Sequence, residues 1–171
     1  MRRTRTSLIG GIVAAVIVVA AVPAAFAALH AAPSTPGNCS RAQLGVRDNG
    51  TDGAAGTIYG AWVFTNLSGK TCKLFGYPGM QLYSRVGRPF PTIVKRSLKP
   101  TPTLVTLAPG ASATFFSSYG DVSSGSQGCP KSAVAQITAP NDFSSLFIPA
   151  ELQPCRGIVN VSAVKAGVHG P

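Results

Sequence analysis

Short stretches of alternating apolar and polar residues follow one another from about residue 43 onward. The clearest is residues 57–65, where Ile58, Trp62 and Phe64 fall on one side of an extended strand and Gly60 leaves room on that side. No stretch after residue 30 keeps the 3.6-residue period of an amphipathic helix. The same pattern predicts further strands at residues 43–47, 72–75, 80–83, 103–107, 112–119, 134–138, 146–148 and 158–164.

Turn-forming residues separate these stretches. The pairs Asn49-Gly50 and Asp52-Gly53 tolerate positive φ, so we expect a turn there between the first two strands. Residues 76–79 and the pair Pro109-Gly110 fit type II turns, in which Pro presets φ at the second position and Gly supplies positive φ at the third. About nine short strands with this punctuation predict an all-β fold, an antiparallel β-sandwich.

The first thirty residues have a different character. Three arginines within the first five residues precede an uncharged apolar run at residues 8–29, which ends with small residues around Ala25 and Ala27. This order is typical of a secretory signal peptide, and the small-residue site with Pro23 just before it favours cleavage after Ala27. The run is also long enough to span a bilayer as an uncleaved anchor helix. In both alternatives the positive N-terminus directs the rest of the chain outward, so it is secreted or stays at the extracytoplasmic face of the membrane.

These features divide the chain into four parts. Residues 1–27 are a signal peptide or membrane anchor, and residues 28–38 are a linker containing Pro and Ser. Residues 39–165 form the β-sandwich domain, and residues 166–171 form a C-terminal tail.

Positive charge is concentrated in one part of the 171-residue chain. Its net charge is +10, and removal of residues 1–27 leaves twelve basic residues against five acidic ones. No acidic residue lies between Asp52 and Asp121. The basic residues of that interval, which we call the basic segment, are Lys70, Lys73, Arg85, Arg88, Lys95, Arg96 and Lys99.

The basic segment predicts contact with an anionic surface, either lipid headgroups or acidic envelope polymers. Its part at residues 85–99 is interrupted by prolines and is expected to be an irregular loop or an edge strand. The simpler alternative is a solvated face whose charges keep an edge strand from aggregating. Nucleic acid is not an expected partner, because no nucleic-acid-binding motif accompanies the charge.

Four cysteines follow the apolar run, at Cys39, Cys72, Cys129 and Cys155. An even number in an exported chain favours disulfides. Of the three possible pairings we favour Cys39–Cys72 with Cys129–Cys155, because each closes a local loop. A zinc site is not expected, since no two cysteines are closely spaced and no His lies between them.

Residues that usually carry catalysis are scarce. The two histidines, His30 and His169, fall outside the expected domain, so a Ser–His–Asp arrangement or a His-ligated metal has no central residue. We therefore expect no enzyme, no cofactor, and no catalytic or metal site. The carboxylates all fall in or beside turns, where we expect them to serve turn and capping chemistry: Asp48, Asp52, Asp121, Asp142 and Glu151.

Three stretches of the sequence carry a resemblance. Residues 56–82 read GTIYGAWVFTNLSGKTCKLFGYPGMQL, residues 105–119 read VTLAPGASATFFSSY, and residues 155–164 read CRGIVNVSAV. In this order, with four cysteines, the chain resembles domain-of-unknown-function family 4232, whose members are exported or lipid-anchored envelope proteins, mostly of actinobacteria. The resemblance implies an immunoglobulin-like sandwich with two disulfides and no established catalytic residues.

The expected function is that of a non-enzymatic binding or interaction module of the cell envelope. It would contact anionic envelope material through residues 70–99. The alternative is a protein-recognition domain, accessory to an envelope enzyme or complex, which would bind its protein partner through loops or an edge strand.

Overall fold

The computed structural model describes residues 35–97, 100–123 and 128–171; the predicted signal peptide or anchor helix lies outside them. The regular secondary structure of the described residues consists of β-strands, apart from one short 3-10 turn at Cys155–Gly157. This confirms the all-β fold class. The strands are β1 (Leu44–Ala54), β2 (Thr57–Asn66), β3 (Cys72–Leu74), β4 (Gly79–Tyr83), β5 (Ile93–Arg96), β6 (Val105–Leu107), β7 (Ser112–Gly120), β8 (Val134–Thr138), β9 (Ser145–Pro149), β10 (Ile158–Val161) and β11 (Lys165–Ala166).

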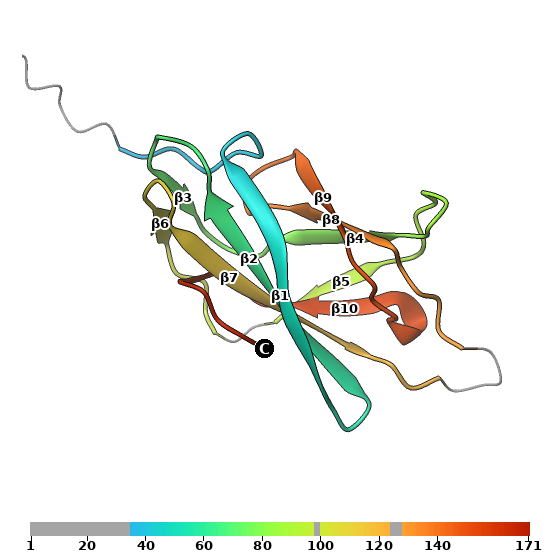
Figure 1. The fold of residues 1–171 in the computed structure, drawn as a ribbon. Coiled ribbons are helices and arrows are strands. Elements are labelled where there is room, and N and C mark those ends of the chain that lie inside the picture. Colours follow the sequence, from blue (N-terminus) through green and yellow to red (C-terminus); the bar gives the residue numbers. More distant parts are fainter. Residues whose placement is uncertain (1–34, 98–99, 124–127) are drawn as a thin grey trace, which may run out of the picture. The chain divides into compact units, whose positions relative to one another are not determined.

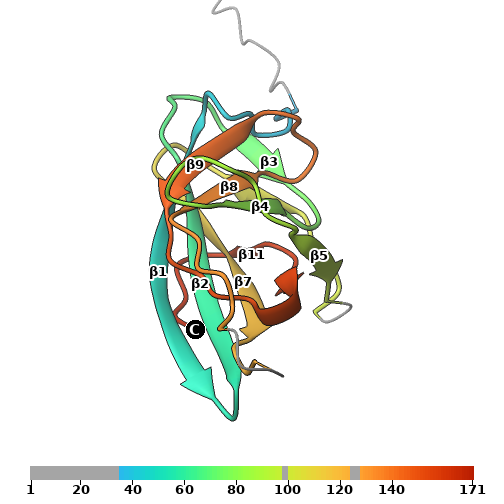
Figure 2. The ribbon, with the colours of Figure 1, turned by 90° about the vertical axis from the view of Figure 1, so that its right-hand side faces the viewer.

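The strands form two main sheets and a separate pair. The larger sheet has the order β1-β2-β7-β10-β5, and β11 pairs with β7 beside β10 (Figure 1). The second sheet has the order β4-β8-β9, and β3 pairs with β6. All these strand pairs are antiparallel except β5 with β10, which is parallel. Figure 2 shows the strands of the three-stranded sheet running across those of the larger sheet.

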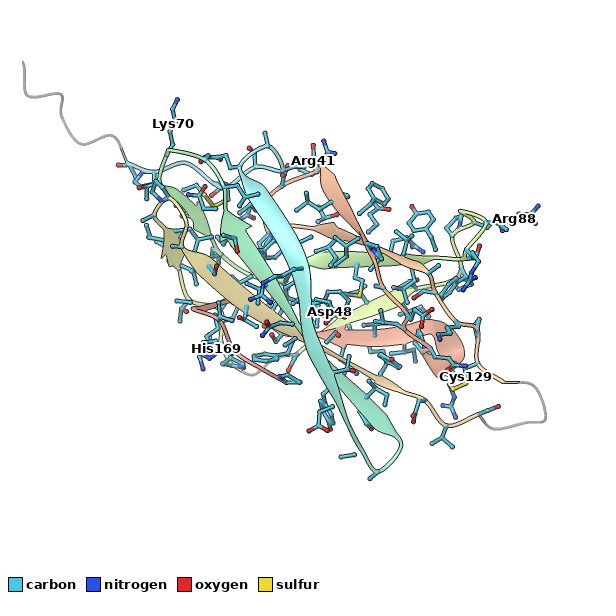
Figure 3. All side chains as sticks on the ribbon, in the orientation of Figure 1. Arg41, Asp48, Lys70, Arg88, Cys129 and His169 are labelled. Carbon is cyan, nitrogen blue, oxygen red and sulfur yellow. A yellow bond between two sulfur atoms is a disulfide. The ribbon has the colours of Figure 1, made fainter. Side chains whose placement is uncertain are left out.

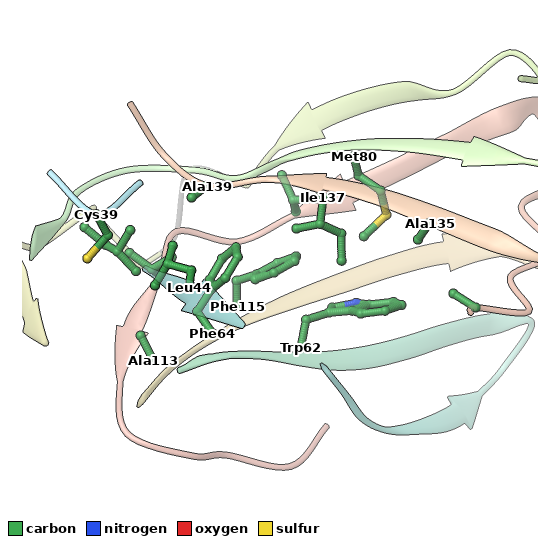
Figure 4. Packing of buried hydrophobic residues seen from close by; sticks show 14 of the residues in the cluster. Cys39, Leu44, Trp62, Phe64, Met80, Ala113, Phe115, Ala135, Ile137 and Ala139 are labelled. Atoms are coloured by element: carbon green, nitrogen blue, oxygen red, sulfur yellow. The ribbon is translucent and has the colours of Figure 1, made fainter. Parts of the chain in front are cut away.

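The core lies between these two sheets. Trp62 and Phe64 of β2 and Phe115 of β7 project from the larger sheet, and each is at most 1% exposed. Leu82 of β4 and Ile137 of β8 face them from the other sheet and are fully buried. Figure 4 shows the aromatic rings packed beneath Ile137. Burial of such side chains stabilises the fold by about 1.5–3 kcal/mol each.

A polar contact between neighbouring strands of the larger sheet lies within this apolar layer. The Trp62 indole Nε1 donates a hydrogen bond of 2.8 Å to Ser117 Oγ. A Cβ at Gly60 would lie 3.0 Å from Ser117 Oγ and 3.4 Å from Trp62 Nε1. The glycine therefore leaves the space that this hydrogen bond occupies, as the sequence pattern predicted.

The first predicted turn is wrong. Residues 49–53 continue β1, and the hairpin instead turns at Ala55 and Gly56, whose φ angles are +49° and +77°. The pairing with β2 shifts register between Asp48 and Thr51. Gly50, with φ +102°, lies in this bulge, and its N–H donates to Asp48 Oδ1. The Asn-Gly pair thus forms a β-bulge, which also needs a residue at positive φ.

The two expected type II turns differ in outcome. Ala111 N donates to Ala108 O at 2.9 Å and Gly110 has φ +77°, which confirms the turn at Pro109-Gly110. At residues 76–79 the prediction is wrong, because Gly76, and not Gly79, has the positive φ. Gly79 begins β4 and pairs with Thr138, so the ladder to β8 fixes it as extended backbone.

The disulfides are Cys39–Cys72 and Cys129–Cys155, which confirms the favoured pairing. Cys39 and Cys72 are each 1% exposed and belong to the core. Cys129 and Cys155 are half-buried. Two disulfides indicate an oxidising, extracytoplasmic environment.

The last predicted strand is broken. It stops at Val161, and residues 165–166 form the separate strand β11, because Ser162 Oγ accepts a hydrogen bond from Phe116 N where a regular ladder would continue.

Residues 167–171 then lie against the outer face of the larger sheet. Thr114 Oγ1 donates to Gly167 O at 2.8 Å and accepts from His169 N at 3.0 Å, and Asn49 Nδ2 donates to His169 O. His169 is thus held against the sheet.

Candidate functional site

The basic segment starts at one end of the domain. Lys70 is exposed in the loop after β2, and Lys73 is half-buried in β3. The backbone of Lys73 donates a hydrogen bond to Gly37 O and accepts one from Cys39 N. Figure 3 shows Lys70 and Arg88 at opposite ends of the domain. The seven predicted anion-contacting residues therefore do not form one patch.

Arg85 and Arg88 lie in the turn between β4 and β5, at residues 84–88, which we call the basic tip. Ser84 N donates to Arg88 O at 2.8 Å, Gly87 N donates to Ser84 O at 2.9 Å, and Arg88 N donates to Ser84 Oγ at 3.1 Å. Gly87 has φ +75°, which the tight reversal requires. Figure 1 shows this connection projecting from the body of the domain.

An apolar side chain sits between the two arginines. Val86 is 79% exposed, and Arg85 and Arg88 are also exposed. Neither arginine forms an ion pair; within the described part of the chain, the ion pair found joins Lys131 to Glu151 at 2.7 Å. The basic tip thus presents two exposed guanidinium groups without an ion pair around a solvated valine, and Arg85 lies within electrostatic reach of Glu151.

Lys95 and Arg96 lie on β5, an edge strand of the larger sheet, so the expectation of an edge strand is met for this part of the segment. Arg96 lies over the ring of Tyr77, with 5.8 Å between its guanidinium carbon and the ring centroid. Lys95 points to the opposite face and is exposed. Lys99 lies outside the described residues.

The fold brings one further cation to the basic tip. Ala133 N donates a hydrogen bond of 2.9 Å to Tyr83 O, and this pairing of β4 with β8 places Lys131 and Glu151 near Arg85. The hydrogen bond and charge of Lys131, together with the charge of Arg85, hold the pKa of Glu151 below its usual value. Sequence reasoning missed Lys131 because only the pairing of β4 with β8 makes it a neighbour of Arg85.

The carboxylates differ in role: Asp142 serves a turn, as predicted, whereas Asp52 lies within β1 and Glu151 pairs with Lys131. Asp52 Oδ1 accepts from Gly53 N, and Asp142 accepts from three backbone N–H groups. Burial acts to raise the pKa of Asp142, but these hydrogen bonds outweigh it and hold the pKa below its usual value. Burial raises the pKa of the Tyr119 hydroxyl.

Residues 35–97, 100–123 and 128–171 hold no group of three or more His, Cys, Asp or Glu side chains that could bind a metal ion. Those same ranges contain no helix long and apolar enough to cross a membrane.

The arrangement of four cysteines and short strands spans the region that a family model recognises. The model "Domain of unknown function (DUF4232)" matches residues 39–166. The chain belongs to this family. The match covers every strand of this DUF4232 domain and both disulfides, and it ends at β11. Searches of curated proteins and of solved structures found no match.

Membership of this family therefore assigns the domain to a group of related proteins but does not indicate an activity. Its chemistry has to be argued from the surface that the fold presents. The basic tip is the part of the predicted segment where two exposed cations are close in the chain and project together.

Proposed function

We propose that this DUF4232 domain is a non-enzymatic binding module that contacts anionic lipid headgroups through its basic tip. The observation that supports this most directly is the exposed Arg85-Val86-Gly87-Arg88 turn, with Val86 79% exposed between the arginines. Guanidinium groups match phosphate oxygens in geometry and charge. An exposed valine between them suits the boundary between headgroups and acyl chains, whereas a soluble anionic polymer offers no apolar layer for it.

The expected affinity of the basic tip for an anionic membrane is modest. Each cation near an anionic membrane surface contributes about 1 kcal/mol, so two arginines give reversible binding that weakens as salt screens the charges. So weak a contact holds a protein at a membrane when a second attachment is already present, or when several copies bind the same membrane together.

The test compares charge-matched variants of residues 35–171, all of which belong to one compact unit. This form omits the apolar run at residues 8–29, which would bind any vesicle by itself. We expect it to sediment with vesicles of equal parts phosphatidylglycerol and phosphatidylcholine, but not with pure phosphatidylcholine. Arg85→Gln with Arg88→Gln should weaken this binding about tenfold to thirtyfold.

The matched control removes the same charge from the opposite end. Lys70→Gln with Lys73→Gln should weaken binding less than about threefold, because these residues do not share the tip. Equal losses in the two double variants would show a net-charge effect and contradict the proposal. Val86→Ser should also weaken vesicle binding; if it does not, and if soluble polyglycerol phosphate binds equally well, an anionic polymer is the ligand instead.

A further inference from the structure

A row of polar side chains crosses the outer face of the larger sheet, away from the basic tip. The register places Lys95 beside Asn160, Asn160 beside Ser118, Ser118 beside Tyr59, and Tyr59 beside Asp52. Residues directly opposite one another in a ladder point to the same face. The neighbouring core residues point inward, so this row faces outward and carries a cation at one end and a carboxylate at the other.

The middle of this row borders a groove. Its volume is about 380 Å³, which lies in the range of small-ligand sites, and its lining includes Tyr59, Phe116, Ser118, Asn160 and Ser162. Tyr59 is 46% exposed and Phe116 is half-buried, so two aromatic rings contribute apolar surface. The groove therefore combines aromatic faces with hydroxyl and amide groups.

Within the described residues, some of these polar groups have spare hydrogen-bonding capacity. Asn160 Nδ2 makes only long contacts, of 3.3 Å to Ser118 O and 3.5 Å to Ser118 Oγ. No described residue hydrogen-bonds the Tyr59 hydroxyl or donates to Asn160 Oδ1. Ser162 Oγ, in contrast, is used by Phe116 N and Ala163 O. The groove can thus both donate to and accept from a bound molecule.

We propose that this groove binds a saccharide whose pyranose ring carries a carboxylate. One face of a pyranose ring presents C–H groups that can pack on Tyr59, and its hydroxyls can pair with Asn160 and Ser118. The exposed ammonium of Lys95 attracts the carboxylate, while Asp52 at the far end of the row repels it. The inference goes beyond the proposed lipid contact, because it uses a different face and different residues.

The test titrates the full chain with α-1,4-digalacturonate and with neutral galactobiose of the same linkage, followed by calorimetry or NMR. We expect weak binding of both, with digalacturonate favoured about threefold to fivefold, the range that one exposed ion pair supplies. Tyr59→Ala should weaken both about tenfold, whereas Tyr59→Phe, which keeps the ring, should stay within about twofold. Lys95→Gln should remove the preference for digalacturonate and leave galactobiose binding unchanged.

Several outcomes would overturn the inference. These are the absence of digalacturonate binding up to about 20 mM, unchanged binding by Tyr59→Ala, or a preference that survives Lys95→Gln. Thermal melting shows whether each variant is folded, and Tyr59→Phe preserves the test if the alanine variant is not. The Arg85 and Arg88 variants should bind digalacturonate like the native chain, so failure at the groove and failure at the basic tip are distinguishable.

Discussion

Asn66 shows how much structure one buried amide can organise. It is fully buried at the end of β2, and its Nδ2 donates to Lys70 O at 2.8 Å and to Leu107 O at 3.0 Å. Its Oδ1 accepts from Ser68 N and Ser68 Oγ. The side chain therefore ties the loop after β2 to the end of β6, and every polar atom of the amide is used.

Replacing Asn66 should destabilise the domain strongly. Asn66→Ala leaves two carbonyls and the Ser68 donors without their partner, and we expect a loss of about 2–4 kcal/mol in the free energy of unfolding. Asn66→Asp should be comparably damaging, since a buried carboxylate cannot donate to two carbonyls. Urea unfolding measures both. The exposed amide Gln153, which donates once to Cys129 O, is the control, and Gln153→Ala should change stability by less than about 0.5 kcal/mol.

Asp142 makes the fold sensitive to acid. Its Oδ2 accepts from Arg41 N at 2.6 Å, and its Oδ1 accepts from Phe143 N and Ser144 N. Because these bonds favour the carboxylate, the pKa is lower in the folded chain than in the unfolded chain. The stabilisation is therefore complete above the unfolded pKa and is lost as pH falls through the folded pKa.

The melting temperature should thus decrease below about pH 4. Asp142→Asn should lower the melting temperature at pH 7 and reduce its dependence on pH between about 5 and 3. Thermal melts across this range measure both effects. An unchanged acid profile in the asparagine variant would show that other carboxylates carry the acid sensitivity.

Among the elements, the two disulfides should differ in how readily they are reduced. Cys39 and Cys72 are 1% exposed, whereas Cys129 and Cys155 are half-buried. A thiolate can attack only an accessible sulfur, so low concentrations of dithiothreitol should reduce Cys129–Cys155 first. Alkylation and peptide mapping at increasing reductant would show the order, and simultaneous reduction would contradict it.

Removing one or the other disulfide should also lower the free energy of unfolding by different amounts. The enclosed loops have similar lengths, with sequence separations of 33 and 26, so the chain-entropy contribution is about 3–4 kcal/mol for each. Cys39→Ala with Cys72→Ala also removes two core side chains, and we expect it to be the more destabilising double variant. Denaturant unfolding of the two double variants tests this ranking.

Strands in which apolar and polar residues clearly alternate were predictable from the sequence, and β8 has the predicted bounds. β5 has no such pattern: its sequence is Ile-Val-Lys-Arg between prolines, and its partner β10 lies about sixty residues later. Gly157 permits this pairing, because a Cβ there would overlap Pro91 O. The bulge at Gly50 was not predictable either, since a glycine after asparagine suits a turn or a bulge equally.

The basic segment could be found by counting charges, but its arrangement could not. Lys70 and Arg88 belong to different ends only because the chain crosses from one sheet to the other between them. The groove beside Tyr59 had no signal in the sequence, since its lining comes from strands that are distant in the chain. Residue types predicted which chemistry was present, whereas the pairing of strands decided where it lies.

For the whole molecule, the C-terminal residues act as a cover on the larger sheet. Thr114 is fully buried although it faces outward, because Gly167 and His169 hydrogen-bond to it. Val63, opposite Thr114 in the ladder, is also fully buried. The tail therefore covers Thr114 on the outer face of the sheet.

Deleting residues 168–171 should expose this face. We expect a loss of about 1–3 kcal/mol in stability, since Thr114 loses a partner and apolar surface is hydrated. Binding of a hydrophobic dye should increase at temperatures where the domain is still folded. A truncated chain that melts like the native one and binds no more dye would show that the tail contributes little.

The parallel pairing of β5 with β10 has a consequence for biosynthesis. β5 emerges from the ribosome well before β10, because its partner residues lie much later in the chain. Residues 93–96 therefore lack this partner until residues 158–161 have been synthesised. Their charges, Lys95 and Arg96, keep that waiting strand soluble. The parallel pair can form only after β10 has been synthesised, so this edge of the larger sheet is completed late in folding.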